Sequence, residues 1–177
     1  PILHFQKMNG AGNDFVLLDN RDGSLALTGA QIARLCDRHR GIGADGLLLV
    51  EKPEAQADFR MRYYNADGRE AEMCGNGARC FARFVNRLAP ASNGRVTFET
   101  PAGLISATLR GDQVSLGMSQ PGPFAHGVEL DAAGQSRTVY SINTGVPHAV
   151  LLVDDLEGTE VHPLGAALRH HHHFQPR

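Results

Sequence analysis

The sequence has few cysteines, little net charge and no long apolar run. Its 177 residues carry three cysteines and a formal net charge of −2, and no basic run is interleaved with aromatics, which argues against general nucleic-acid binding. The longest apolar run, near 47–50, is far too short to cross a bilayer. The first residues, PILHFQKM, lack the charged and apolar regions of a signal peptide. We therefore expect a cytoplasmic protein with neither nucleic-acid nor membrane partners.

The three cysteines, Cys36, Cys74 and Cys80, cannot form a fully paired disulfide framework. No Cys-x-x-Cys pair occurs and Cys74 and Cys80 are six residues apart, so zinc-site spacing is absent and no metal is expected. Cys36 lies on the apolar face of one predicted helix. Cys80 lies on another predicted helix and points away from Cys74. Both are predicted to be packing residues.

Strands outnumber helices in the hydrophobic pattern. One helix is expected after the Thr28–Gln31 capping box and should stop at Gly41; another, with apolar residues at helical spacing, should run from Cys74 to about Ala89. Short hairpins, rather than helices, join most strands. The expected strands are ILHFQKM, DFVLLD, GLLLVE, DFRMRYYN, RVTFET, GLISATLR, QVSLGM, RTVYSIN and HAVLLVDD. The fold class is α+β: a curved, mainly antiparallel, barrel-like sheet wrapped around the central helix at 74–89.

The segment EMCGNGARCF (Glu72–Phe81) places a cysteine where a glycine-rich turn leads into a helix. Unpaired N–H groups and the helix dipole favour negative charge there, and so favour the thiolate of Cys74. Gly75 and Gly77 would let the backbone approach an anion closely. The segment could therefore hold a base beside a bound carboxylate. A helix-start turn with an incidental cysteine is the alternative.

Four sequence blocks resemble the diaminopimelate epimerase family: KMNGAGNDF (Lys7–Phe15), GIGADGLLLVE (Gly41–Glu51), YNADGREAEMCGNGARCFARF (Tyr64–Phe84) and NTGVPHAV (Asn143–Val150). They cover almost all of Leu3–Asp155. The resemblance implies interconversion of LL- and meso-diaminopimelate, on the lysine and peptidoglycan route, without pyridoxal phosphate or metal. The implied fold has two pseudo-symmetric halves, each a barrel-like sheet around a helix, with one catalytic cysteine from each half.

The resemblance also implies roles for individual residues. Cys74 matches the catalytic cysteine of the first half, and His148 matches a histidine that tunes the protonation of the cysteine pair. The implied substrate-binding residues are Asn13, Asn65, Gly75 and Asn76.

Two positions depart from the family pattern. Gly46 stands where many members carry Gln, so a side-chain contact is lost there. Val146 stands where many carry Asn, so that contact is missing or comes from a neighbour such as Thr144.

Inversion of a carbon requires two acid–base groups, one on each side, because a single base exchanges only the proton on its own face. The family's second glycine-flanked cysteine has no counterpart in this sequence. We therefore expect 1–155 to be an N-terminal half-domain and 156–177 a crossover towards a C-terminal half that carries the second cysteine. The chain alone should be inactive. The implied partners are the amino-acid substrate, the other half and, from the resemblance, a second copy in a homodimer.

The sequence also allows functions other than diaminopimelate epimerisation to be compared. Proline racemases share the Cys-Gly helix start but usually carry His where Asn76 stands, and phenazine-type isomerases lack the cysteine. A non-catalytic anion-binding half-domain is an alternative of a different class, and a sluggish Cys74 thiol would favour it. A redox sensor would need a resolving cysteine within reach of Cys74, which the sequence does not offer.

Overall fold

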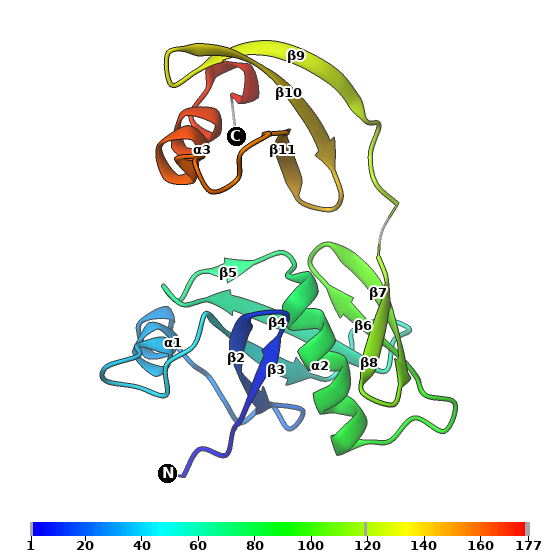
Figure 1. Ribbon diagram of the computed structural model, residues 1–177. Helices are drawn as coiled ribbons and strands as arrows, with labels where there is room; N and C mark the ends of the chain where they lie inside the picture. The colour runs from blue at the N-terminus through cyan, green and yellow to red at the C-terminus, as the bar shows by residue number, and fades with distance from the viewer. Residues whose placement is uncertain (1, 119, 176–177) are drawn as a thin grey trace. The chain divides into compact units, whose positions relative to one another are not determined.

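A computed structural model describes residues 2–118 and 120–175, and the chain divides into two compact units, Pro1–Ser119 and Gln120–Arg177 (Figure 1). Each unit has its own sheet. The predicted boundary between a half-domain at 1–155 and a crossover at 156–177 stays a prediction. Among the described residues, no helix combines the length and apolarity needed to span a bilayer, and the cytoplasmic location also stays a prediction.

The first unit confirms the predicted fold class. Its sheet has the strand order β1-β2-β3-β4-β6-β7-β8, with β5 beside β4, and only the β2–β3 and β4–β6 pairs are parallel. The strands are β1 (Gln6–Gly10), β2 (Asn13–Asp19), β3 (Gly46–Glu51), β4 (Phe59–Asn65), β5 (Glu70–Ala71), β6 (Arg95–Thr100), β7 (Gly103–Arg110) and β8 (Gln113–Gly117). The sheet curves around helix α2 (Gly75–Leu88), which contacts β1, β2, β3, β4, β7 and β8 (Figure 1).

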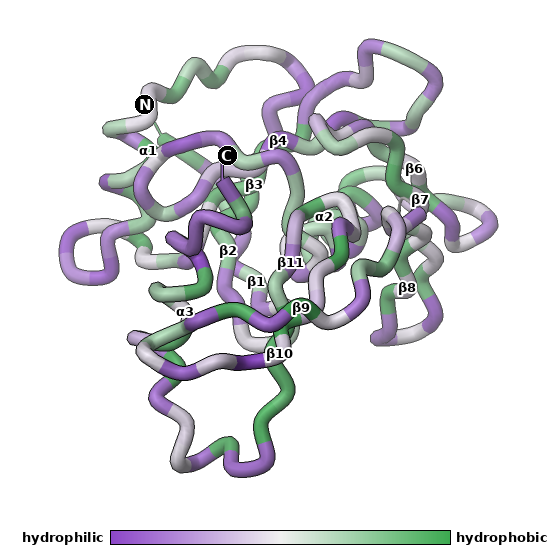
Figure 2. The backbone as a smooth tube through the Cα atoms, turned by 90° about the horizontal axis from the view of Figure 1, so that it is seen from above, coloured by the Kyte–Doolittle hydropathy of each residue, from purple (hydrophilic) through white to green (hydrophobic). Residues whose placement is uncertain are grey.

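Helix α2 forms where its apolar spacing predicts it. Of the predicted apolar positions, Ala78, Phe81, Ala82 and Val85 are fully buried, whereas Leu88, in the last turn, is half-buried. Between them, polar residues and arginines interrupt the apolar stretches along the helix (Figure 2). Cys80 is 2% exposed and packs in this core, as predicted.

Strands β2 and β3 are buried on both faces, which explains their uninterrupted apolar runs. Phe15, Leu17, Leu48 and Val50 face α2, whereas the alternate residues Val16, Leu18, Leu47 and Leu49 pack with helix α1 (Gly29–Cys36). Because side chains alternate along a strand, each strand serves two cores.

Helix α1 begins as predicted, with both hydrogen bonds of the Thr28–Gln31 capping box. Its predicted end at Gly41 is wrong, because the helix ends at Cys36 and Asp37 is extended. Gly41 is instead required for a close return of the chain: a Cβ there would lie 2.0 Å from the carbonyl oxygen of Arg34. Cys36 is buried, as predicted, and burial raises the pKa of its thiol to about 11.

The second unit holds a three-stranded antiparallel sheet in the order β11-β10-β9. The strands are β9 (Ala125–Ala132), β10 (Gln135–Asn143) and β11 (Pro147–Leu151); helix α3 (Val161–Arg169) and the 3₁₀ turn η1 (His172–Phe174) follow. Leu164 and Leu168 of α3 pack on Leu130 and Val139. Strand β9 is absent from the sequence prediction, since most of its residues are exposed and its apolar pattern is weak.

Candidate active site

Cys74 is the N-cap residue of α2. Its backbone is extended (φ −140°, ψ 115°), its carbonyl accepts the first helical hydrogen bond from Ala78 N at 2.8 Å, and its Sγ accepts from Gly77 N at 3.4 Å. Of the three cysteines it alone is not buried. The sulfur thus lies among the N–H groups of the first helical turn, where a negative charge is favoured.

The two glycines after Cys74 differ in their surroundings. A Cβ on Gly77 would lie 3.4 Å from a Leu48 methyl carbon and 3.5 Å from the Phe15 ring, so Gly77 seats the helix start against the core. A Cβ on Gly75 would meet only the Arg79 guanidinium, at 3.8 Å. The first turn is therefore packed on one side and leaves room for a ligand on the other.

Two of the predicted substrate-binding residues lie side by side. Asn76 Nδ2 donates to Asn13 Oδ1 at 2.9 Å, although the residues are 63 positions apart. Asn13 reaches this place because a two-residue turn, with Ala11 at φ 50° and Gly12 at φ 99°, joins β1 to β2. Positive φ at both positions is the requirement of a type I′ hairpin turn.

The turn also presses β1 against the start of α2. A Cβ on Gly10 would lie 2.7 Å from the carbonyl oxygen of Asn76 and 2.8 Å from Cys80 Sγ. Only glycine permits this approach, which brings the hairpin and the helix N-terminus together.

An ion-pair cluster that the sequence analysis missed fixes the Asn13 amide. Asn13 Nδ2 donates to Asp45 Oδ2 at 3.0 Å, and Arg38 donates to Asp45 at 2.8 Å and to both oxygens of Asp14 at 2.7 and 3.0 Å. Lys7 Nζ lies 3.1 Å from Asp14. The only available signal was the position of two aspartates within the recognised blocks. Their common partner is Arg38, which lies outside those blocks.

This cluster lowers the pKa of both aspartates. The Arg38 guanidinium holds the pKa of Asp14 well below its usual range, and the hydrogen bond from Asn13 is the largest cause of the lowered pKa of Asp45. Both carboxylates therefore remain ionised at neutral pH and continue to accept these hydrogen bonds.

The lowered pKa of Asp14 predicts a pH-dependent contribution to stability. This contribution to the free energy of unfolding should be complete above the unfolded-state pKa of about 4. It should be lost as the pH falls through the lower pKa of the folded state. Asp14→Asn should therefore lower the thermal midpoint at neutral pH, with the difference from wild type narrowing as the pH falls below about 4. Exposed Asp154→Asn is the control. A difference that stays constant with pH would contradict the role of the ionised carboxylate.

Asn65 ends β4 and begins the tight turn predicted at NADG, in which Gly68 N donates to Asn65 O at 2.9 Å. Its side-chain oxygen accepts from the Tyr63 hydroxyl at 2.7 Å. Asn65 pairs across the sheet with Gly46.

His148 lies on β11, in the second unit. Its Nδ1 is 2.7 Å from the carbonyl oxygen of Val146 and 3.4 Å from Thr144 Oγ1. The side chain is exposed, and Val146 is 44% exposed. The relation of His148 to Cys74 stays a prediction.

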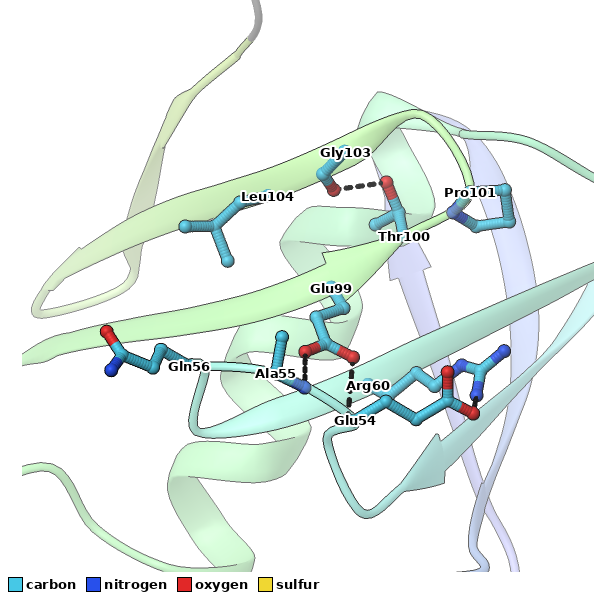
Figure 3. Close-up of a pocket in the computed structure, with 9 residues that line it drawn as sticks. All are labelled: Glu54, Ala55, Gln56, Arg60, Glu99, Thr100, Pro101, Gly103 and Leu104. Atoms are coloured by element: carbon cyan, nitrogen blue, oxygen red, sulfur yellow. Dashed lines mark hydrogen bonds and ion pairs between the residues drawn. The ribbon is translucent and has the colours of Figure 1, made fainter.

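A separate pocket of about 680 Å³ lies between the loop after β3 and the β6–β7 hairpin (Figure 3). Its charged groups are bound to one another: the Glu99 carboxylate accepts from the backbone of Glu54 and Ala55, and Arg60 pairs with Glu54. None of the predicted site residues lines it, so it does not compete with the Cys74 site for the predicted chemistry.

Solved structures of other proteins share this fold. A hydroxyproline epimerase from Agrobacterium vitis matches with a TM-score of 0.59 at 17% identity, over 91% of this chain and 52% of that one. A phenazine biosynthesis protein from Bacillus anthracis matches with a TM-score of 0.57 at 19% identity, over 84% and 54%. At such identities the likeness establishes the fold alone.

Sequence relatives define the family. A sequence model of the diaminopimelate epimerase family matches residues 5–123. The diaminopimelate epimerase of Pseudomonas syringae pv. tomato is 42% identical over 189 aligned positions, which cover 99% of this chain and 68% of that protein. The chain belongs to the diaminopimelate epimerase family, a family of isomerases. It spans about two thirds of this relative and about half of the two solved structures.

Proposed function

We propose that the chain supplies one half of a site that epimerises LL-2,6-diaminopimelate to meso-diaminopimelate, without a cofactor, for lysine and peptidoglycan precursor synthesis. The observation that carries the proposal is the position of Cys74, the one cysteine not buried, as the N-cap of α2. Membership of the diaminopimelate epimerase family supports diaminopimelate as the substrate. The second cysteine belongs to a C-terminal half that is not part of these 177 residues.

The reaction breaks the bond between the α-carbon and its hydrogen. One sulfur takes the proton as a thiolate, and the thiol on the opposite face returns a proton to the carbon. The α-proton is less acidic than a thiol by about 20 pK units, which corresponds to about 27 kcal/mol at about 1.36 kcal/mol per unit. The carbanion must therefore be stabilised strongly within the site.

The helix N-terminus supplies that stabilisation. As the α-carbon loses its proton, charge moves onto the α-carboxylate, and preorganised N–H donors are most effective where charge develops. In this proposal the backbone at Gly75 and Asn76 binds the carboxylate, the side chains of Asn13, Asn65 and Asn76 orient the substrate, and His148 tunes the protonation of the cysteine pair. Asp45 accepts a hydrogen bond from Asn13 and is itself held by a hydrogen bond from Arg38.

Turnover assays test the proposal. The 177-residue chain should form no meso-product from LL-diaminopimelate, whereas the chain extended by the remaining C-terminal third of the Pseudomonas relative should form it. Proline, offered in the same assay, should not racemise. Turnover by the unextended chain would refute the two-cysteine requirement. A well-folded extended protein without turnover would favour the anion-binding alternative.

A further inference from the structure

The space beside Gly46 is already filled. Gly46 opens β3, and a Cβ placed on it would lie 2.7 Å from Tyr63 Cε2 and 2.6 Å from the carbonyl oxygen of Tyr64. Real Cβ atoms essentially never approach other atoms so closely. Glycine is therefore needed at position 46, because the Tyr63 ring occupies the space that a Cβ would take.

Tyr63 reaches the site face of the sheet from the neighbouring strand. Gly46 pairs with Asn65, and Tyr63 lies two residues before Asn65, so the three positions share one face of the sheet. Tyr63 is 8% exposed, and its ring stands edge-on to that of Phe15, with the ring centroids 6.1 Å apart. Phe15 also borders the space beside Gly77 at the start of α2. The ring is thus fixed between the core and the helix N-terminus.

The Tyr63 hydroxyl is a hydrogen-bond donor at neutral pH. Burial, followed by the charge on Cys74, raises the pKa of Tyr63 to about 12, so the proton remains on the oxygen. Cys74 packs against the same buried cluster that contains Tyr63. The hydroxyl donates to Asn65 Oδ1 at 2.7 Å.

This contact decides which end of the Asn65 amide is available to a ligand. An amide has one acceptor atom and one donor group. With Oδ1 bound to Tyr63, the Nδ2 group points the other way, and Asn65 itself is exposed. An N–H donor in that position suits a carboxylate.

We infer that Tyr63 is a positioning residue of this site: its ring takes the space of a side chain at position 46, and its hydroxyl orients Asn65 so that Nδ2 donates to a carboxylate bound beside Cys74. The inference rests on the proposed function, because the carboxylate is that of the amino-acid substrate.

The test uses two alkylating reagents on the 177-residue chain, iodoacetate, which carries a carboxylate, and iodoacetamide, which does not. The ratio of their rates at Cys74, divided by the same ratio for a small free thiol, measures how well the site attracts a carboxylate. Cys36 and Cys80 are buried, and burial raises the pKa of each thiol to about 11, so they should react slowly. Peptide mass mapping confirms which cysteine is labelled.

Tyr63→Phe removes only the hydroxyl and keeps the ring over Gly46. The normalised ratio should exceed one in wild type and fall about five-fold in the variant, the effect of one lost hydrogen bond. Asn65→Ala should lower it equally, and the double variant no further, because both changes interrupt the same contact. Tyr64→Phe, which removes the neighbouring hydroxyl, is the matched control and should keep the wild-type ratio. Thermal midpoints show that each variant is folded.

The outcomes separate the inference from the proposed function. If wild type favours iodoacetate and Tyr63→Phe does so equally, the inference is overturned and the proposed function stands. If wild type shows no preference, the carboxylate site itself is overturned. NMR relaxation of the Asn65 side-chain amide in the unaltered chain gives a further measurement: an order parameter above about 0.6 supports a fixed amide, and one below about 0.6 overturns the positioning role.

Discussion

Replacing Cys74 by alanine in the extended protein should lower kcat by about a thousand-fold, within the range for loss of an acid–base group. The physical reason is specific to inversion, since the variant keeps a thiol on only one face of the α-carbon. KM should change little, because Cys74 contributes an acid–base group and the N–H donors of α2 remain. The measurement is the rate of meso-product formation from LL-diaminopimelate.

Deuterium exchange at the α-carbon distinguishes the loss of one acid–base group from disruption of the whole site. In heavy water, Cys74→Ala should still exchange the α-hydrogen on the remaining face, without inversion, whereas a disrupted site would exchange on neither. Cys80→Ala is the matched control, because Cys80 is buried in the core six residues further along the same helix. Full turnover by Cys74→Ala would exclude the proposed role of this residue.

Phe81→Ala should have the largest effect on stability, lowering the free energy of unfolding by about 3–5 kcal/mol. Phe81 is fully buried at the centre of α2. The centroid of its ring lies 4.8 Å from the ring centroid of Phe98 on β6. The substitution leaves a cavity between the helix and the sheet that surrounds it. Urea unfolding, followed by circular dichroism, measures the change.

Phe5→Ala is the control for this prediction. Phe5 has the same side chain but is 46% exposed, just before β1. Its replacement should cost at most about 1 kcal/mol, since exposed substitutions are usually mild. Equal losses for the two variants would contradict a core centred on α2.

The sequence predicted most of the local structure around Cys74. The apolar spacing after CGNG identified α2 and its buried face, and the capping box located the start of α1. These features depend on residues a few positions apart, which explains why a pattern can reveal them. The end of α1 was misplaced because Gly41 is required by a chain return rather than by a helix cap.

Contacts between distant segments could not be predicted in the same way. The Asn13–Asn76 pair joins residues from a hairpin and a helix, and the Asp14–Arg38–Asp45 cluster adds a third segment. Such contacts can be inferred from the residue types only when the fold that brings the residues together is known. The family resemblance indicated that Asn13 and Asn76 matter, but it gave no reason for the orientation of either amide.

The sequence by itself determined the family, the fold class and the one cysteine placed at a helix start, since these follow from blocks of neighbouring residues. Tertiary structure decided what surrounds that cysteine. From the sequence, Gly46 indicates only that a side-chain contact is lost. In the folded chain, the missing side chain leaves the space that the Tyr63 ring occupies. The reason is geometric: residues 17 positions apart along the chain become neighbours only when β3 and β4 pair, and the ring then reaches Asn65.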